Sequence, residues 1–214
     1  ATSITPTFNG AAAGTYTVTL SVGSGANTQT LTKTITLLAG GMPTITVTPK
    51  QVLLDLNAPA PTLMDGVTAN DVEDGNITSR ITTTGSVNTS IQGVYNVTYK
   101  VKDNDNNEAT ETRTYIVGNN PVVGTNYVLF ADNFTKHMND VDALDNAIIV
   151  DAKAKAYKLS DGTDAAITIT NKGGYSATVG PYKINFAVIN EMTTTKEIVA
   201  SVYEHGNPAL DEIV

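Results

Sequence analysis

The sequence predicts an all-β protein built of tandem β-sandwiches, and three observations lead to that class. Thr, Val, Gly and Asn are abundant, and Thr and Val favour half-buried pleated strands. One alternating strand pattern occurs three times along the 214 residues. A polar turn rich in Asn, Asp, Gly or Thr follows each copy, as expected for a hairpin.

The repeated strand begins with Gly, and a Tyr two residues later opens an alternation of apolar with mostly polar residues. Its copies lie at 14–22, 93–101 and 180–188. Period two is typical of a strand with one buried face and one wet face. A second strand follows each copy after the turn, at 31–37, 109–117 and 196–202. Each pair predicts a hairpin that closes a domain.

The spacing of the copies predicts the domain organisation. The leading glycines Gly14, Gly93 and Gly180 are 79 and 87 residues apart, which is roughly the length of an immunoglobulin-like sandwich. Gly and Pro punctuation at 39–43 and 118–121 indicates two short linkers. We therefore expect a partial domain of C-terminal strands at 1–40, immunoglobulin-like domains at 41–119 and 120–205, and a tail or the start of a further unit at 206–214.

The third unit contains the one helix that the sequence predicts. In the segment 140–148, Val141, Leu144 and Ile148 fall three and four residues apart on one helical face. Asp140 is placed to cap the amino end of this helix. We expect the helix to cover one end of the sandwich.

Composition excludes several classes of function. A net charge of −8 argues against binding to nucleic acid or to an anionic membrane surface. The absence of Cys excludes disulfides, thiol catalysis and thiolate metal sites. No apolar run approaches the length of a membrane span, so we expect no membrane insertion in this chain.

The segment 65–78, followed by Gly85 to Ser90 and the strand from Gly93, resembles a bacterial immunoglobulin-like domain related to the hyalin repeat. This resemblance covers 44–117 and departs from the family at Asn106, where the family usually has Gly in the final turn. Asn tolerates the same left-handed conformation. The first segment resembles the end of a polycystic-kidney-disease-type domain, and the third unit resembles an adhesin-type immunoglobulin-like domain. The resemblance implies spacer and adhesion roles at the surface of a bacterium.

A search for catalytic chemistry finds no candidate residues. The two histidines, His137 and His205, lie in no metal-binding spacing, and we expect a surface or capping role for His137. The chain has no nucleophile elbow and no phosphate-binding glycine loop. We therefore predict that the protein is not an enzyme and that it has no catalytic, cofactor-binding or committed metal-ligating residues.

Two acidic clusters are the best candidates for a binding site. One contains Asp71, Glu73 and Asp74, and the other contains Asp103, Asp105 and Glu108. Asp and Asn are ordinary turn formers, and this interpretation is favoured. Calcium, which takes six to eight oxygen ligands, is the alternative, although neither run matches a twelve-residue calcium loop.

Glycan binding needs aromatic platforms, and the chain has no Trp. The repeat explains Tyr16, Tyr95 and Tyr182 as core or half-core residues. Tyr157, Tyr175 and Tyr203 are left as candidates for exposed rings.

These observations favour a non-catalytic stalk or spacer with a role in adhesion, located outside the cell, at the cell surface or in the cell wall. The alternatives are a module that binds a host matrix protein or a cell-surface polysaccharide, and accessory domains of a secreted polysaccharide hydrolase.

Overall fold

The computed structural model describes residues 14–23, 25–37 and 40–204, and these residues form an all-β protein with one short helix. The predicted fold class is therefore confirmed. The chain divides into two compact units. The first contains the described residues up to Thr46, together with Val67–Thr82 and Tyr99–Glu111. The second contains Val47–Gly66, Thr83–Thr98 and the described residues from Thr112 onward.

The first unit begins with the predicted hairpin. Strand β1 (Gly14–Val22) pairs with β2 (Gln29–Leu37), and the short helix η1 (Gly25–Asn27) lies in the turn between them. The register places Tyr16 opposite Ile35 and Leu20 opposite Leu31. Both strands are largely exposed, so the apolar side chains of this hairpin are not in a core.

A three-stranded sheet has the order β3 (Thr44–Val47), β5 (Val67–Asp71) and β6 (Gly75–Asn76). Alternation is strict in β5, where Val67, Ala69 and Asp71 are buried and the residues between them are exposed. The short helix η2 (Thr78–Arg80) leads from β6 towards β7 (Thr82–Thr84). Buried and exposed residues therefore alternate along β5, as they do in a strand with one buried face.

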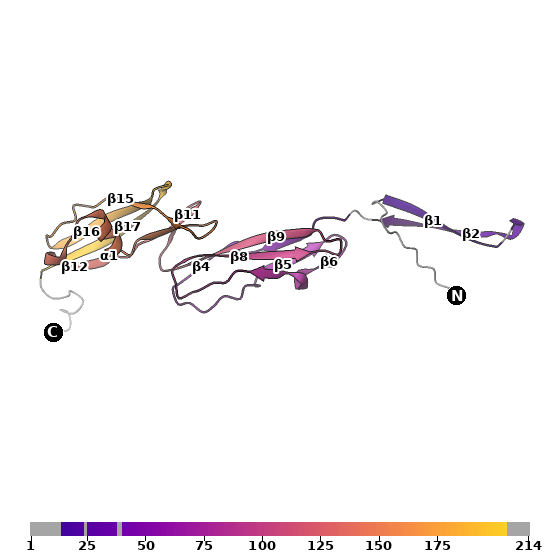
Figure 1. Ribbon diagram of the computed structural model, residues 1–214, viewed down its shortest axis with the longest axis horizontal. Coiled ribbons are helices and arrows are strands. Elements are labelled where there is room, and N and C mark those ends of the chain that lie inside the picture. The colour runs from indigo at the N-terminus through magenta and orange to yellow at the C-terminus, as the bar shows by residue number, and fades with distance from the viewer. Residues whose placement is uncertain (1–13, 24, 38–39, 205–214) are drawn as a thin grey trace. The chain divides into compact units, whose positions relative to one another are not determined.

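A four-stranded sheet has the order β4–β9–β8–β7, in which β8 (Gly93–Lys102) and β9 (Glu108–Val117) are the second predicted hairpin (Figure 1). Strand β4 (Gln51–Leu54) runs parallel to β9. The turn of the hairpin contains Asn106 with φ of 68°, so the left-handed conformation expected at this position is present. β8 and β9 contribute residues to both compact units.

The C-terminal part of the second unit consists of two four-stranded sheets. One has the order β10 (Val122–Val123), β11 (Tyr127–Phe130), β13 (Lys155–Lys158) and β14 (Asp164–Ala165). The other has the order β12 (Phe134–His137), β17 (Glu191–Tyr203), β16 (Gly180–Val188) and β15 (Ile167–Asn171). Leu129 and Ala156 from the first sheet and Ile184, Phe186 and Ala200 from the second belong to one buried cluster. The third predicted hairpin, β16–β17, thus supplies half of a sandwich core.

The predicted helix at 140–148 is wrong in its bounds. Residues Met138–Asp140 form the short helix η3, and α1 extends over Asp145–Asp151. The cap on Asp140 is also wrong, because Leu144 is the N-cap residue and makes no side-chain cap bond. Asp142 instead accepts a hydrogen bond from the Leu144 N–H at 2.9 Å, a local turn that delays the start of the helix.

Only part of the predicted apolar face of this helix packs against the core. Ile148 is fully buried in the sandwich core and Val141 packs against it, whereas Leu144 is 64% exposed. No helix in the described ranges is long and apolar enough to cross a membrane.

Tyr95 and Tyr182 are equivalent in the second and third hairpins. Each is the third residue of its strand, and each is half-buried. The hydroxyl of Tyr95 donates to the carbonyl of Ile91 at 2.8 Å, and that of Tyr182 donates to the carbonyl of Thr178 at 2.6 Å. A tyrosine that bonds to the backbone a few residues upstream of this strand is a feature of immunoglobulin-type sandwiches. Both residues are half-core residues, as predicted.

Candidate functional site

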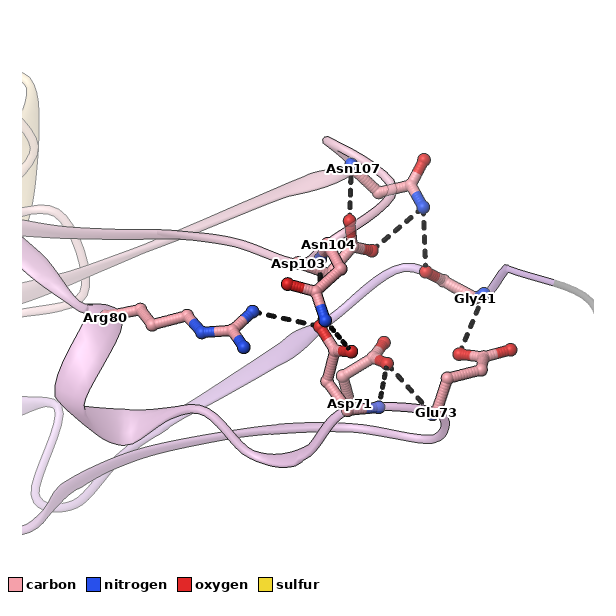
Figure 2. Close-up of polar contacts among 8 residues, drawn as sticks. Gly41, Asp71, Glu73, Arg80, Asp103, Asn104 and Asn107 are labelled. Carbon is pink, nitrogen blue, oxygen red and sulfur yellow. Dashed lines mark hydrogen bonds and ion pairs between the residues drawn. The ribbon is translucent and has the colours of Figure 1, made fainter. Parts of the chain in front are cut away.

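The acidic candidates gather where β5 and β8 end and where the chain approaches β3. We call this group the turn cluster, and Figure 2 shows its hydrogen bonds and ion pair. Its members are Gly41, Asp71, Glu73, Asp74, Arg80, Asp103, Asn104 and Asn107. The structure therefore brings the first acidic cluster of the sequence together with Asp103 of the second.

Asp71, the last residue of β5, fixes the turn that follows it. Its side chain is 4% exposed, and its Oδ1 accepts hydrogen bonds from the N–H groups of Glu73 at 2.9 Å and Asp74 at 3.0 Å. The hydrogen bond from Asp74 is the largest of the causes that lower the pKa of Asp71 below its usual value. Its Oδ2 is buried and has no hydrogen-bond donor among the described residues.

Asp74 joins the two turns of the cluster. Its Oδ2 accepts from the Asn104 N–H at 2.8 Å and from Arg80 Nη1 at 2.9 Å. Its Oδ1 accepts from the Asn104 side-chain amide at 2.5 Å. Both carboxylate oxygens of Asp74 therefore already accept hydrogen bonds, and one of the donors is the guanidinium of Arg80.

Asp103 holds the β8–β9 turn and, through Asn107, the chain before β3. The side chain of Asp103 is 8% exposed and accepts from the N–H and from the amide of Asn107, each at 2.8 Å. The same amide of Asn107 donates to the carbonyl of Gly41 at 3.1 Å, while the Gly41 N–H donates to Glu73 at 3.4 Å. The predicted linker at 39–43 is thus hydrogen bonded at Gly41 to both turns.

Two of the acidic candidates are placed differently. Asp105 lies against Gly40, where a Cβ atom would approach Asp105 Oδ2 to 2.8 Å. Glu108 lies on β9 and pairs with Lys100 at 2.5 Å and with Lys102 at 3.7 Å, so it does not belong to the turn cluster. The hydrogen bond from Lys100 lowers the pKa of Glu108.

The chemistry of the turn cluster is that of hydrogen-bonded turns. Carboxylate and carbonyl oxygens suit a hard cation such as calcium, but the oxygens of Asp74 and Asp103 already accept N–H donors. Among the described residues, no three acidic, His or Cys side chains are gathered closely enough to hold a metal ion. A proton donor needs a raised pKa, whereas that of Asp71 is lowered. The calcium alternative stays a prediction.

His137, at the end of β12, has a capping role, as the sequence predicts. Its Nδ1 accepts from the Asn139 N–H at 3.2 Å at the start of η3. Its Nε2 lies 2.7 Å from the Glu204 carbonyl, and its ring meets Tyr203 edge to face. His205 lies outside the described residues.

The prediction of exposed tyrosine rings is wrong for Tyr157 and Tyr175, which are 7% and 5% exposed. Tyr157 packs edge to face on Phe130 and donates to the Gln92 carbonyl at 3.3 Å. Tyr175 packs edge to face on Phe134 and Tyr182. Burial raises the pKa of both phenols. Because they are buried, the rings of Tyr157 and Tyr175 are not available as glycan platforms, whereas Tyr203 is half-buried.

Residues 63–117 match the family model of a bacterial surface protein, Ig-like domain. This match supports the predicted resemblance for the middle of the chain and a location at a bacterial surface. The resemblances predicted for the first segment and the third unit stay predictions. A search of curated proteins found no match.

The chain is only distantly similar to solved structures. A lipoprotein of Bacteroides thetaiotaomicron is 16% identical, with a TM-score of 0.36, and the match covers 74% of this chain and 98% of that one. A structure of Clostridium perfringens ZmpB, comprising CBM51-2 in complex with GlcNAc and INT domains, is 20% identical with a TM-score of 0.31. That match covers 62% of this chain and 30% of the other chain.

Proposed function

We propose that the chain is a non-catalytic spacer of a bacterial surface protein, in which immunoglobulin-like domains joined by fastened linkers hold an adhesive segment away from the cell. A spacer must resist bending at its joints, which requires linkers that are tied to the neighbouring strands. The proposal therefore depends on how the two predicted linkers, at 39–43 and 118–121, are held.

The main support for the proposal is the set of hydrogen bonds that hold the second predicted linker, 118–121. The Gly118 N–H donates to the Leu54 carbonyl at 2.9 Å, and the Leu56 N–H donates to Asn119 Oδ1 at 3.2 Å. Lys196 donates to the Asn120 carbonyl, and burial lowers the pKa of this lysine. Three successive residues of the linker are thus held by strands β4 and β17 or by the residues next to them, which supports a joint with little freedom.

A buried apolar cluster strengthens the same joint within the second unit. Val94 and Ile116, which precede the linker, belong to one cluster with Val128, Phe130 and Tyr157, which follow it. The side-chain amide of Asn96 also donates to the carbonyl of Leu159 at 3.2 Å and to that of Ser160 at 2.8 Å. Bending at the linker would expose these apolar side chains and break these hydrogen bonds, each of which costs free energy.

Small-angle scattering of the whole chain tests the spacer. A compact globule of this length has a radius of gyration near ~17 Å, and a spacer predicts a clearly larger value. Phe130→Ala removes an aromatic ring from the buried cluster at the joint, and we expect it to broaden the distribution of interatomic distances obtained from scattering. Met192→Ala, at an exposed position, serves as the control. A wild-type radius near that of the globule would contradict the proposal.

A second candidate is recognition of a host protein or a glycan by the C-terminal domain. A hollow of about 400 Å³ beside α1 is lined by Asp140, Asp142 and Asp151, with Leu144 and Val150 exposed at its rim. Binding of the whole chain to matrix proteins or glycans, lost in the variant Leu144→Ser/Val150→Ser, would favour this function. The third alternative, accessory domains of a polysaccharide hydrolase, would be favoured by a hydrolase domain in the same polypeptide.

A further inference from the structure

A hollow lined by cations lies on the first unit, at the edge formed by η2, β7 and β8. Its volume is about 430 Å³, and its lining residues are Arg80, Thr82, Lys100, Val101 and Lys102. We call it the cationic groove. Three of the 13 lysines and arginines of a chain with a net charge of −8 line this one groove. The hollow beside α1, by contrast, is lined by three aspartates and one lysine.

Two carboxylates form ion pairs with the three cations of the cationic groove. Lys100 and Lys102 share the single carboxylate of Glu108. Arg80 pairs with Asp74, which also accepts two hydrogen bonds from Asn104. The three cations of the groove therefore form ion pairs with only two carboxylates.

The cations of the groove are accessible to a ligand. Their side chains are 42%, 49% and 58% exposed for Arg80, Lys100 and Lys102, respectively. Ion pairs at this exposure stabilise a protein only weakly, because water and salt screen them. An incoming anion can therefore replace Glu108 as the partner of either lysine at little cost.

The spacing of the cations indicates a repeating anion. Lys100 and Lys102 are two residues apart on β8 and face the same side, which places their Cα atoms about 7 Å apart. Arg80, the last residue of η2, lines the same groove. The aliphatic stems of the lysines supply an apolar floor on which a sugar or polyol carbon can rest. Such a row matches a linear polymer that carries one negative charge per repeat.

We infer that the cationic groove binds an anionic glycopolymer, a sugar or polyol chain with one carboxylate or phosphate in each repeat. The choice of a glycopolymer over other polyanions depends on the proposed function at a bacterial surface, where the spacer would lie against such polymers. Binding in the groove would attach the side of the spacer to the surrounding polymer. Because the rest of the chain is negatively charged, only the groove attracts the polymer. The affinity for the polymer should therefore fall steeply as salt screens this attraction.

Binding of two defined polymers to the whole chain tests the inference. Polygalacturonate supplies carboxylates, poly(glycerol phosphate) supplies phosphates, and neutral dextran is the uncharged reference. We expect at least one anionic polymer to bind at low salt, and its identity assigns the source of the anion. The variant Lys100→Gln/Lys102→Gln should raise the dissociation constant at least tenfold. The control Lys153→Gln/Lys155→Gln, which removes the same charge from exposed positions of the second unit, should change it less than twofold.

Several outcomes would overturn the inference. These are an equal loss in both double variants, competition by dextran, or equally tight binding of polyglutamate or single-stranded DNA of matched charge. If Lys100→Gln/Lys102→Gln does not fold, amide shifts of the wild-type protein decide, because polymer at the groove must perturb residues 78–84 and 98–104 first. Scattering of the unliganded protein tests the spacer without any ligand, so failure of the groove and failure of the spacer are distinguishable.

Discussion

Replacing the buried Arg113 should destabilise the protein more than any exposed charge does. Arg113 lies on β9 with 2% of its surface exposed. Its Nε donates to the Pro49 carbonyl at 2.8 Å, its Nη1 to the Leu63 carbonyl at 3.3 Å, and its Nη2 to the Thr48 carbonyl at 3.2 Å. The guanidinium thus satisfies three backbone carbonyls on either side of β4, which no side chain with one or two donors can do from a single position.

The expected loss follows from these acceptors. A buried carbonyl left without a donor costs about 1–3 kcal/mol, and some of the three will recover a water molecule. Arg113→Met keeps much of the side-chain volume and should lower the free energy of unfolding by about 3–5 kcal/mol. Arg113→Lys should lose less, because its ammonium reaches some of the carbonyls. That loss is a large part of the 5–15 kcal/mol that stabilises a typical domain.

Urea unfolding followed by far-ultraviolet circular dichroism measures the loss. The matched control is Arg80→Met, which removes an arginine that is 42% exposed and should cost about 1 kcal/mol or less. Equal midpoints for Arg113→Met and Arg80→Met would refute the reasoning, since they would show that the three carbonyls do not depend on the guanidinium.

Four further predictions concern the turns and the joint. Millimolar calcium should leave the melting temperature within about one degree of its value in chelator, because donors already occupy most of the turn cluster; a rise of several degrees would instead support calcium binding. The pKa of Asp71 is lower in the folded protein than in the unfolded chain, where it is near ~3.9. Asp71 therefore contributes stability that is present above the unfolded pKa and is lost as the pH falls through the folded pKa. In the variant Asp71→Asn, the free energy of unfolding should depend less steeply on pH in this acidic range. Tyr182→Phe removes one hydroxyl hydrogen bond and should cost about 1 kcal/mol in urea unfolding. Gly162→Ala places a Cβ 2.5 Å from the Val94 carbonyl at a φ of 73° and should cost about 1–3 kcal/mol; a neutral effect would show that the joint is loose.

The sequence predicts the hairpins well because their information is local. Alternation places β8, β9 and β16 close to their observed bounds, and a short Asn and Asp turn gives Asn106 its left-handed conformation. The acidic candidates could be found in the same way, but not their assembly. Asp74 and Asn104 are thirty residues apart and meet only because two strands end at the same place.

The features that the sequence did not reveal depend on non-local packing. Arg113 carries no signal of burial, since arginine is usually exposed and its acceptors are carbonyls of β4 and the segments beside it. Tyr157 and Tyr175 lie outside the repeated pattern, and each is buried by an aromatic partner from another segment. The sequence does not predict the start of α1, because the side chain of Asp142 competes with the helix for the backbone N–H of Leu144.

The three hairpins show that one sequence pattern can give very different levels of burial. In β16–β17 the apolar face meets a second sheet, and Ile184 and Phe186 are fully buried. In β1–β2 the same alternation leaves Val22 and Leu31 at 75% and 65% exposed. The pattern fixes strand pairing and register in both, because these depend on backbone hydrogen bonds and turn length. Burial depends on whether another layer covers the face, so covering the face of β1–β2 would contribute more to its stability than its own strand pairing does.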